Sequence, residues 1–186
     1  EVVLTEQERE MGVAVCDIGG GTTDLAIYVD GDVWHTMVMA VGGSHITQDI
    51  AHGLRLPIPT AEEVKKKYGY ASKSEVGMEE TFSVQPFGED KPILFNRQDL
   101  AHIIEARVAE LFSLVLQEVK RSGYDGLLPA GMVGLKQVIE VGPMSGESNV
   151  ICWLTEHGFE HTQGTISLDG RPIGVALVQR PRFFGE

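Results

Sequence analysis

The chain has 186 residues, of which 42% are apolar and 23% are charged. This is the balance of a globular protein, and the length suffices for one ordinary domain or two small ones with a buried core. Its 27 acidic residues outnumber its 15 basic residues, which gives a formal net charge of −12. That excess argues against nucleic acid as the main ligand, because phosphate backbones are held by clustered Lys and Arg.

The two cysteines, Cys16 and Cys152, lie far apart and outside any CxxC pattern. Cys16 falls in an apolar, strand-like run, which favours a buried, reduced thiol and a reducing compartment. No apolar run approaches the roughly 20 residues that a membrane-spanning helix needs. The first residues contain neither a starting methionine nor signal-peptide character, so we expect the chain to be a piece of a longer protein.

The first third of the chain predicts three strands followed by a helix. Valine-rich or alternating runs bounded by glycine predict strands at 12–18, 23–30 and 33–41, and an Asp-Gly-Asp step predicts a hairpin between the last two. We therefore expect an antiparallel three-stranded unit whose first turn is a glycine loop. Apolar residues at helical spacing then predict a helix over about 45–55.

Two prolines, Pro57 and Pro59, are expected to stop this helix. Thr60 and Glu63 form a capping-box pattern, which predicts a second helix over about 61–68. Alternating residues predict two edge-type strands within 76–95.

A long amphipathic helix is predicted next, with Asn96 as its N-cap and Gly123 closing its C-terminus. A Gly/Pro-rich linker, 124–134, separates it from a predicted strand over 135–141. We expect a helix over 149–157 and a hairpin in the remainder.

Residues 15–24 read VCDIGGGTTD, an aspartate at a strand end followed by glycines, threonines and a second aspartate. Glycine lets a ligand approach the backbone without a Cβ, and consecutive amides aimed at one point bind an anion. Asp17 beside such an anion is suited to hold Mg²⁺ through water or to orient an attacking water, while Thr22 and Thr23 offer hydroxyl donors. The pattern fits the terminal phosphates of a nucleotide. The alternative is that the three glycines only make a tight hairpin turn.

This loop is not a Walker A motif, because no Lys follows in the GK[ST] position, and it joins two strands rather than opening a helix. Three further motifs follow it in order: VGGSHITQDIAHGL, AEEVKKKYG and RQDLAHIIEARVAELFSLV. Together the four motifs resemble the actin-like ATPase superfamily, and within it the FtsA family of bacterial cell-division proteins, over about residues 1–130.

The resemblance implies an α/β fold: the C-terminal half of an actin-like, ribonuclease H-like ATPase, with a mixed sheet of five-stranded type and flanking helices. It also implies a discontinuous core subdomain, 1–46 and 122–186, with an inserted α/β subdomain at 47–121.

The resemblance assigns roles to individual residues. Asp17 resembles the acid near the Mg²⁺-bound water, which makes it the expected catalytic and metal-site residue, with Asp24 second to it at the metal. The residues expected to bind the nucleotide are Gly19, Gly20, Gly21 and Thr22 around the β- and γ-phosphates, Gly42 and Gly43 at a helix start, Glu62 and Lys65 toward the adenosine, and Gly142 in a third nucleotide motif.

Several features depart from this pattern or leave alternatives open. Glu62 and Lys65 are also compatible with a weak ion pair on a solvated helix face. In the third motif Pro143 replaces a glycine, so one backbone donor is lost. The first phosphate loop of the family and its amphipathic membrane helix are not visible in the sequence. His157 and His161, four residues apart, form a weak alternative metal pair that has no clear third ligand.

By resemblance, the intact protein binds ATP and Mg²⁺, polymerises, and recruits the tubulin-like protein FtsZ to the inner face of the cell membrane. It is expected to be cytoplasmic, with membrane contact only through parts missing from this chain. Hydrolysis would be slow, and the fragment alone is expected to bind nucleotide weakly and to be inactive. The inserted subdomain is the expected partner surface. The alternative is a non-enzymatic interaction module with a degenerate nucleotide site, and pilus-assembly or shape-determining relatives are a third possibility.

Overall fold

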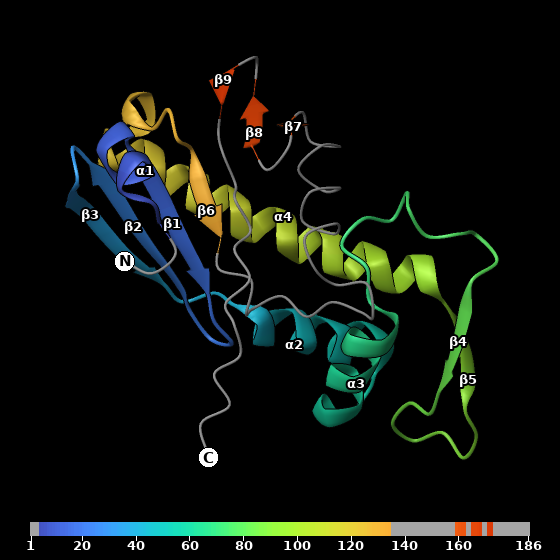
Figure 1. Ribbon diagram of the computed structural model, residues 1–186. Helices are drawn as coiled ribbons and strands as arrows, with labels where there is room; N and C mark the ends of the chain where they lie inside the picture. The colour runs from blue at the N-terminus through green and yellow to red at the C-terminus, as the bar shows by residue number, and fades with distance from the viewer. Residues whose placement is uncertain (1–3, 135–158, 163–164, 169–170, 173–186) are drawn as a thin grey trace, which may run out of the picture.

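A computed structural model describes residues 4–134, 159–162, 165–168 and 171–172. A four-stranded sheet lies at one end, a long helix runs along it and beyond it, and two shorter helices and a two-stranded hairpin gather at the other end (Figure 1). The architecture is α/β, as predicted.

The main sheet has the strand order β3-β2-β1-β6. Its strands are β1 (Val13–Ile18), β2 (Thr23–Val29), β3 (Asp32–Met39) and β6 (Met132–Gly134). The first three pair antiparallel, as the sequence predicts, and β6 pairs parallel to β1, so the sheet is mixed. Four strands are described where a five-stranded type is expected.

A tight turn joins β2 to β3 with Asp30 at φ 53° and Gly31 at φ 85°. Two consecutive positive φ values are typical of the type I′ hairpin, whose twist matches that of its strands. The Asp-Gly pattern in the sequence therefore identifies this turn correctly.

The long helix α4 (Arg97–Ser122) begins and ends where its caps predict. The Asn96 side chain accepts a hydrogen bond from the Gln98 amide at 2.7 Å. Gly123 adopts the left-handed conformation (φ 80°) that glycine allows at a helix end. Buried apolar residues recur along one face of α4, and this face packs against the rest of the protein.

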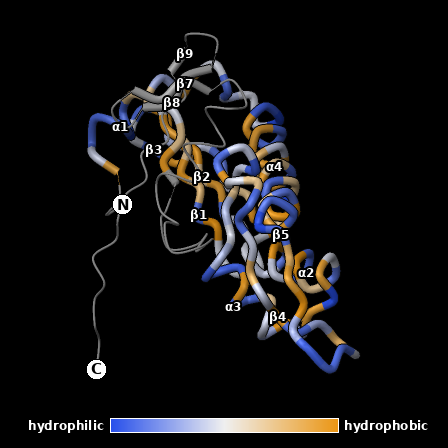
Figure 2. The backbone as a smooth tube through the Cα atoms, turned by 90° about the vertical axis from the view of Figure 1, so that its right-hand side faces the viewer, coloured by the Kyte–Doolittle hydropathy of each residue, from blue (hydrophilic) through white to orange (hydrophobic). Residues whose placement is uncertain are grey.

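Two hydrophobic clusters share α4. The sheet cluster joins its C-terminal half to one face of the sheet and contains Ala14, Cys16, Ile18, Leu25, Ile27, Met39, Val41, Leu111, Val115 and Val119. The outer cluster joins its N-terminal half to the two shorter helices and the hairpin and includes Ile46, Ile50, Leu54, Val64, Phe82, Leu100, Ile104 and Val108. Figure 2 shows the corresponding hydrophobic segments along β1 and β2 and the alternation of hydropathy along α4.

The remaining elements are α1 (Glu6–Met11), α2 (Gly43–Leu54), α3 (Ile58–Tyr68), β4 (Thr81–Val84), β5 (Ile93–Asn96), the 3₁₀ turn η1 (Asp125–Leu127), and a separate antiparallel sheet of β7 (Phe159–Thr162), β8 (Thr165–Leu168) and β9 (Arg171–Pro172). The two predicted edge strands within 76–95 are β4 and β5, which pair antiparallel. The hairpin predicted in the remainder corresponds to β8 and β9.

Two boundary predictions are wrong. Helix α3 begins at Ile58 rather than after Thr60, because Pro59 falls in the first turn, where its missing N–H costs nothing. The linker 124–134 contains η1 and β6, so the parallel strand starts at Met132. The predicted elements over 135–141 and 149–157 lie outside the described residues.

Within the described part of the chain, no helix is both long and apolar enough to cross a membrane. Burial raises the pKa of the Cys16 thiol to about 12, and the nearby carboxylates of Asp17 and Asp24 add to the effect. The burial of this thiol, predicted from the sequence, is confirmed, and a thiol with this pKa is unreactive at neutral pH.

Candidate functional site

The glycine loop 19–22 joins β1 to β2. The Gly19 N–H donates to the Thr22 carbonyl at 2.6 Å, which closes the turn. The amides of Gly20, Gly21 and Thr22 make no hydrogen bond to other described residues, and all three residues are exposed. Within the described part of the chain, the turn thus has three consecutive N–H groups without a protein partner, the arrangement that an anion would need.

Gly20 and Gly21 are not required by the geometry of the turn. A Cβ added at either position meets nothing within 4 Å, and neither residue has a positive φ. The hypothesis that these glycines serve only a tight turn therefore lacks a steric reason at both positions. Gly19 differs, because a Cβ there would lie 3.1 Å from the Thr22 carbonyl oxygen.

Asp17 and Asp24 are opposed across the β1–β2 ladder. Paired residues point to the same face, and this face is opposite the one that packs on α4, since Cys16 and Leu25 form the neighbouring pair in the sheet cluster. Asp24 is exposed and accepts a hydrogen bond from the Thr22 hydroxyl at 3.4 Å, while Asp17 is half-buried. Two directly opposed carboxylates repel each other, and a cation between them offsets that repulsion.

The first amides of α2 face the glycine loop. Gly43 N–H donates to the Gly19 carbonyl at 2.9 Å, and Ser44 N–H donates to the Gly20 carbonyl at 2.7 Å. The Ser44 hydroxyl donates to the same Gly20 oxygen at 2.6 Å. Gly42 is needed for this approach, because a Cβ there would lie 2.4 Å from the Gly19 oxygen.

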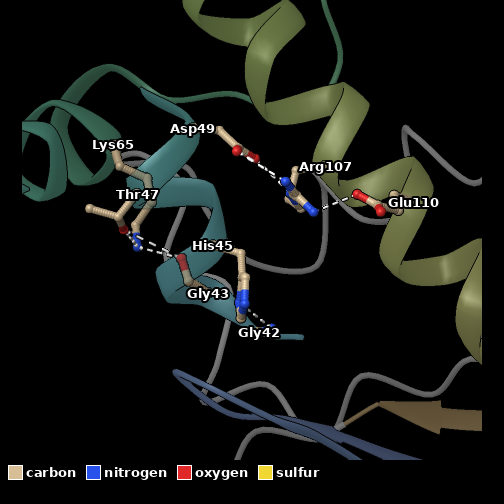
Figure 3. Close-up of polar contacts among 8 residues, drawn as sticks. All are labelled: Gly42, Gly43, His45, Thr47, Asp49, Lys65, Arg107 and Glu110. Carbon is tan, nitrogen blue, oxygen red and sulfur yellow. Dashed lines mark hydrogen bonds and ion pairs between the residues drawn. The ribbon is translucent and has the colours of Figure 1, made fainter. Parts of the chain in front are cut away.

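The Gly42 amide also has a partner within the chain. It donates to Nδ1 of His45 at 3.1 Å, a contact drawn in Figure 3. An anion could use the amides of Gly42 and Gly43 only by replacing these internal bonds. Ser44 and His45 are site residues that the sequence analysis missed; a Ser at the first turn of a helix is the available signal.

Glu62 and Lys65 lie together on α3 and reach the start of α2. Lys65 Nζ lies 2.7 Å from a Glu62 carboxylate oxygen. It also lies 2.8 Å from the Thr47 hydroxyl and 3.3 Å from the Gly43 carbonyl, two contacts that Figure 3 draws. Lys65 is only 7% exposed, so the prediction of a weak pair on a solvated face is wrong for this residue. An ammonium has three N–H donors, and these three acceptors occupy them.

The Glu62 carboxylate is ionised in this network. Burial alone raises its pKa, but hydrogen bonds from Lys65 and Thr47 outweigh that effect, and the net pKa lies below its ordinary value. The pair therefore fixes α3 against the N-terminus of α2, next to the glycine loop.

A shallow groove of about 330 Å³ lies where α2 meets α4. Arg107 of α4 binds both carboxylate oxygens of Asp49 on α2, at 2.6 and 3.0 Å, and also pairs with Glu110 (Figure 3). The hydrogen bond to Asp49 raises the pKa of Arg107. Ile103 and Ala106 add apolar walls, so the groove combines charged and apolar side chains.

The remaining residues singled out in the sequence lie at or beyond the third nucleotide motif. Gly142, Pro143 and His157 lie outside the described residues. His161 lies on β7. Within the described residues, no group of three or more His, Cys, Asp or Glu side chains is arranged to hold a metal.

Comparison with known families decides the identity of the chain. A family model described as "Cell division protein FtsA" matches residues 14–179. The chain belongs to the FtsA family. It is 48% identical over 131 residues to the cell division protein FtsA of Pseudomonas aeruginosa, covering 70% of this chain and 31% of the relative. It is 42% identical over 138 residues to FtsA of Escherichia coli K12, covering 70% and 33%.

This FtsA-family chain thus spans about a third of the length of the curated relatives it matches. Among solved structures it resembles MreB5 of Spiroplasma citri bound to AMPPNP, with a TM-score of 0.53, 25% identity, and coverage of 68% of this chain and 42% of that one. It also resembles the MamK double helical filament, with a TM-score of 0.58, 15% identity, and coverage of 92% and 50%. The second likeness concerns the fold alone, and together they establish the actin-like ATPase fold.

Proposed function

We propose that this chain is the C-terminal half of an FtsA-type protein and carries part of its ATP·Mg²⁺ site. The observation that supports this most directly is the loop 19–22, in which three consecutive N–H groups are open beside two carboxylates. Such amides bind phosphate oxygens. MreB5, a structural neighbour, is described as bound to AMPPNP and to ADP.

In this proposal, Asp17 and Asp24 would hold Mg²⁺, which when bound would supply charge neutralisation at the terminal phosphates. Asp17 holds the hydrated cation or orients the attacking water, and Asp24 assists from the neighbouring strand. Hydrogen bonding through water suits Mg²⁺, which keeps several of its waters when it binds proteins. Turnover by the fragment alone is expected to be absent, because by resemblance to the family the carboxylates would form only one wall of the nucleotide cleft.

The remaining nucleotide residues are also part of the proposal. Glu62 and Lys65 lie next to the N-terminus of α2, and this position supports a role near the adenosine. To contact the ligand, the Lys65 ammonium would have to give up one of its hydrogen bonds within the chain. Gly142 would complete the third motif. We further propose that 47–121 is an inserted subdomain and that 1–46 and 122–186 form the core.

The proposed role of the intact protein is to polymerise and to recruit FtsZ to the inner face of the membrane. FtsA-family membership supports this, and one neighbour of the fold is described as a double helical filament. The groove between α2 and α4 falls inside 47–121, and its exposed Glu110 and apolar walls suit a peptide with both apolar and charged residues.

A second function has specific support. The ammonium of Lys65 and the first amides of α2 all bind partners within the chain. Such saturation favours an interaction module in which the nucleotide site is degenerate. The two functions differ in whether the loop 19–22 binds phosphate.

Calorimetric titration of the full 186-residue chain with MgATP tests the phosphate site. The parent should bind at millimolar affinity or better, and Asp17→Ala and Gly20→Val should abolish binding. Gly20→Val should unfold at the same temperature as the parent, because its side chain enters open space. Gly126→Val, which also has open space at its Cβ, is the control and should bind normally.

No heat from the parent would favour the interaction module. Equal loss of stability and affinity in Gly20→Val would show that the glycine is architectural.

A further inference from the structure

Two consecutive carbonyl groups of the glycine loop are held by α2. The Gly19 oxygen accepts from the Gly43 amide, and the Gly20 oxygen accepts from both the amide and the hydroxyl of Ser44, at 2.7 and 2.6 Å. A carbonyl oxygen has two lone pairs, so the Gly20 oxygen is fully satisfied by one residue.

These bonds fix the direction of the loop amides. A trans peptide is planar, and its C=O and N–H point in opposite directions. Because the Gly19 and Gly20 carbonyls point toward α2, the N–H groups of Gly20 and Gly21 point away from it. Both N–H groups lack partners among the described residues, and both residues are exposed.

Without the hydrogen bonds from α2, the loop peptides could reverse their orientation, because residues 19–21 of the loop are glycines. A peptide between two glycines meets little steric resistance to rotation, because neither residue carries a Cβ. Rotation of the Gly20–Gly21 peptide would turn a carbonyl oxygen toward the phosphate position and its N–H toward α2. An oxygen in that place repels an anion instead of binding it.

We infer that Ser44 is a positioning residue for the phosphate site: its amide and hydroxyl lock the Gly20 carbonyl onto α2 and thereby aim the Gly21 N–H at the ligand. Gly43 does the same for the Gly20 N–H. Gly42 permits both contacts, because a Cβ there would lie 2.4 and 2.8 Å from the two carbonyl oxygens. This inference rests on the proposed function of the loop 19–22 and gives Gly42 and Gly43 an indirect part in it.

The competing explanation is that these bonds only satisfy the first amides of α2, which need acceptors in any case. That explanation accounts for the amides of Gly43 and Ser44 but not for the Ser44 hydroxyl, which has solvent available. The two explanations differ in what the loss of the hydroxyl does to ligand binding.

The test compares Ser44→Ala, which removes the hydroxyl, with Ser44→Thr, which keeps it. Ser113→Ala, at an exposed position on α4, is the matched control. Each variant of the full chain is titrated with MgATP and, separately, with magnesium pyrophosphate, and its thermal midpoint is measured. The loss of one neutral hydrogen bond predicts affinity about fivefold weaker for both probes in Ser44→Ala. Ser44→Thr and Ser113→Ala should bind as the parent does, and all midpoints should agree within about 2 °C.

Gly42→Ala provides a second variant and should weaken both probes more than Ser44→Ala, because the new methyl group separates the loop from α2. Unchanged affinity in Ser44→Ala, with binding by the parent, would overturn the inference and leave the phosphate site intact. A fall in thermal midpoint without a fall in affinity would also overturn it. No binding of either probe by the parent would refute the phosphate site itself, and the inference with it.

Discussion

Lys65→Met separates a structural role of this lysine from a ligand-binding role. The methionine keeps an unbranched stem in the 7% exposed site but removes the ammonium and its contacts with Gly43, Thr47 and Glu62. Removing one member of a buried ion pair costs about 3–5 kcal/mol. Here the Glu62 side chain is 36% exposed, and Lys66 remains 3.4 Å from its other oxygen, so we expect a smaller loss of about 2 kcal/mol in the free energy of unfolding.

Urea unfolding with linear extrapolation measures this loss, and a thermal midpoint lower by about 4–8 °C should accompany it. Lys66→Met is the matched control, because that side chain is 53% exposed and should cost less than about 0.5 kcal/mol. Equal or greater stability of Lys65→Met, together with weaker nucleotide binding, would refute the reasoning. That outcome would mean that the ammonium is held in place for a ligand.

Three further predictions concern α4 and the end of α2. Leu111→Ala should lower the free energy of unfolding by about 3 kcal/mol in urea titration, since Leu111 is fully buried. The control Ser113→Ala, at an exposed position of the same helix, should lower it by less than about 0.5 kcal/mol. The pKa of Glu118 is lowered to about 2, first by hydrogen bonds from Arg121 and then by the hydrogen bond with His35. The contribution of the ionised Glu118 to the free energy of unfolding is therefore complete above about pH 4.3 and is lost as pH falls through about 2. The stability difference between the parent and Glu118→Gln should therefore shrink on acidification, and a constant difference would contradict this assignment. Arg55→Gly should stabilise the chain by about 0.5–1 kcal/mol, because Arg55 is left-handed (φ 54°) at the end of α2, and thermal melts that show destabilisation would contradict it.

The elements that could be predicted from the sequence have local signals. The strands β1, β2 and β3 follow from apolar runs and an Asp-Gly turn, and α4 follows from Asn96 and Gly123. The start of α3 could not be placed well, because proline is compatible with both the end of one helix and the first turn of the next.

The candidate site could be predicted only in part, because its contacts join distant segments. The sequence identifies the loop 19–22 and the start of α2 as separate motifs, but the bond from Ser44 to Gly20 spans 24 residues and has no sequence pattern. Lys65 follows Glu62 at a spacing typical of exposed ion pairs, and only the position of α2 buries it. Burial and internal hydrogen bonding are therefore what the structure adds to the motifs.

The unbroken course of α4 through both hydrophobic clusters has a mechanical consequence. A helix of 26 residues is a stiff rod about 39 Å long. Its N-terminal half carries Arg107 at the groove and its C-terminal half backs the sheet that ends in the glycine loop. Because α4 is one continuous helix, a displacement of its N-terminal half at the groove would move its C-terminal half as well. That half packs on the strands that carry Asp17 and Asp24.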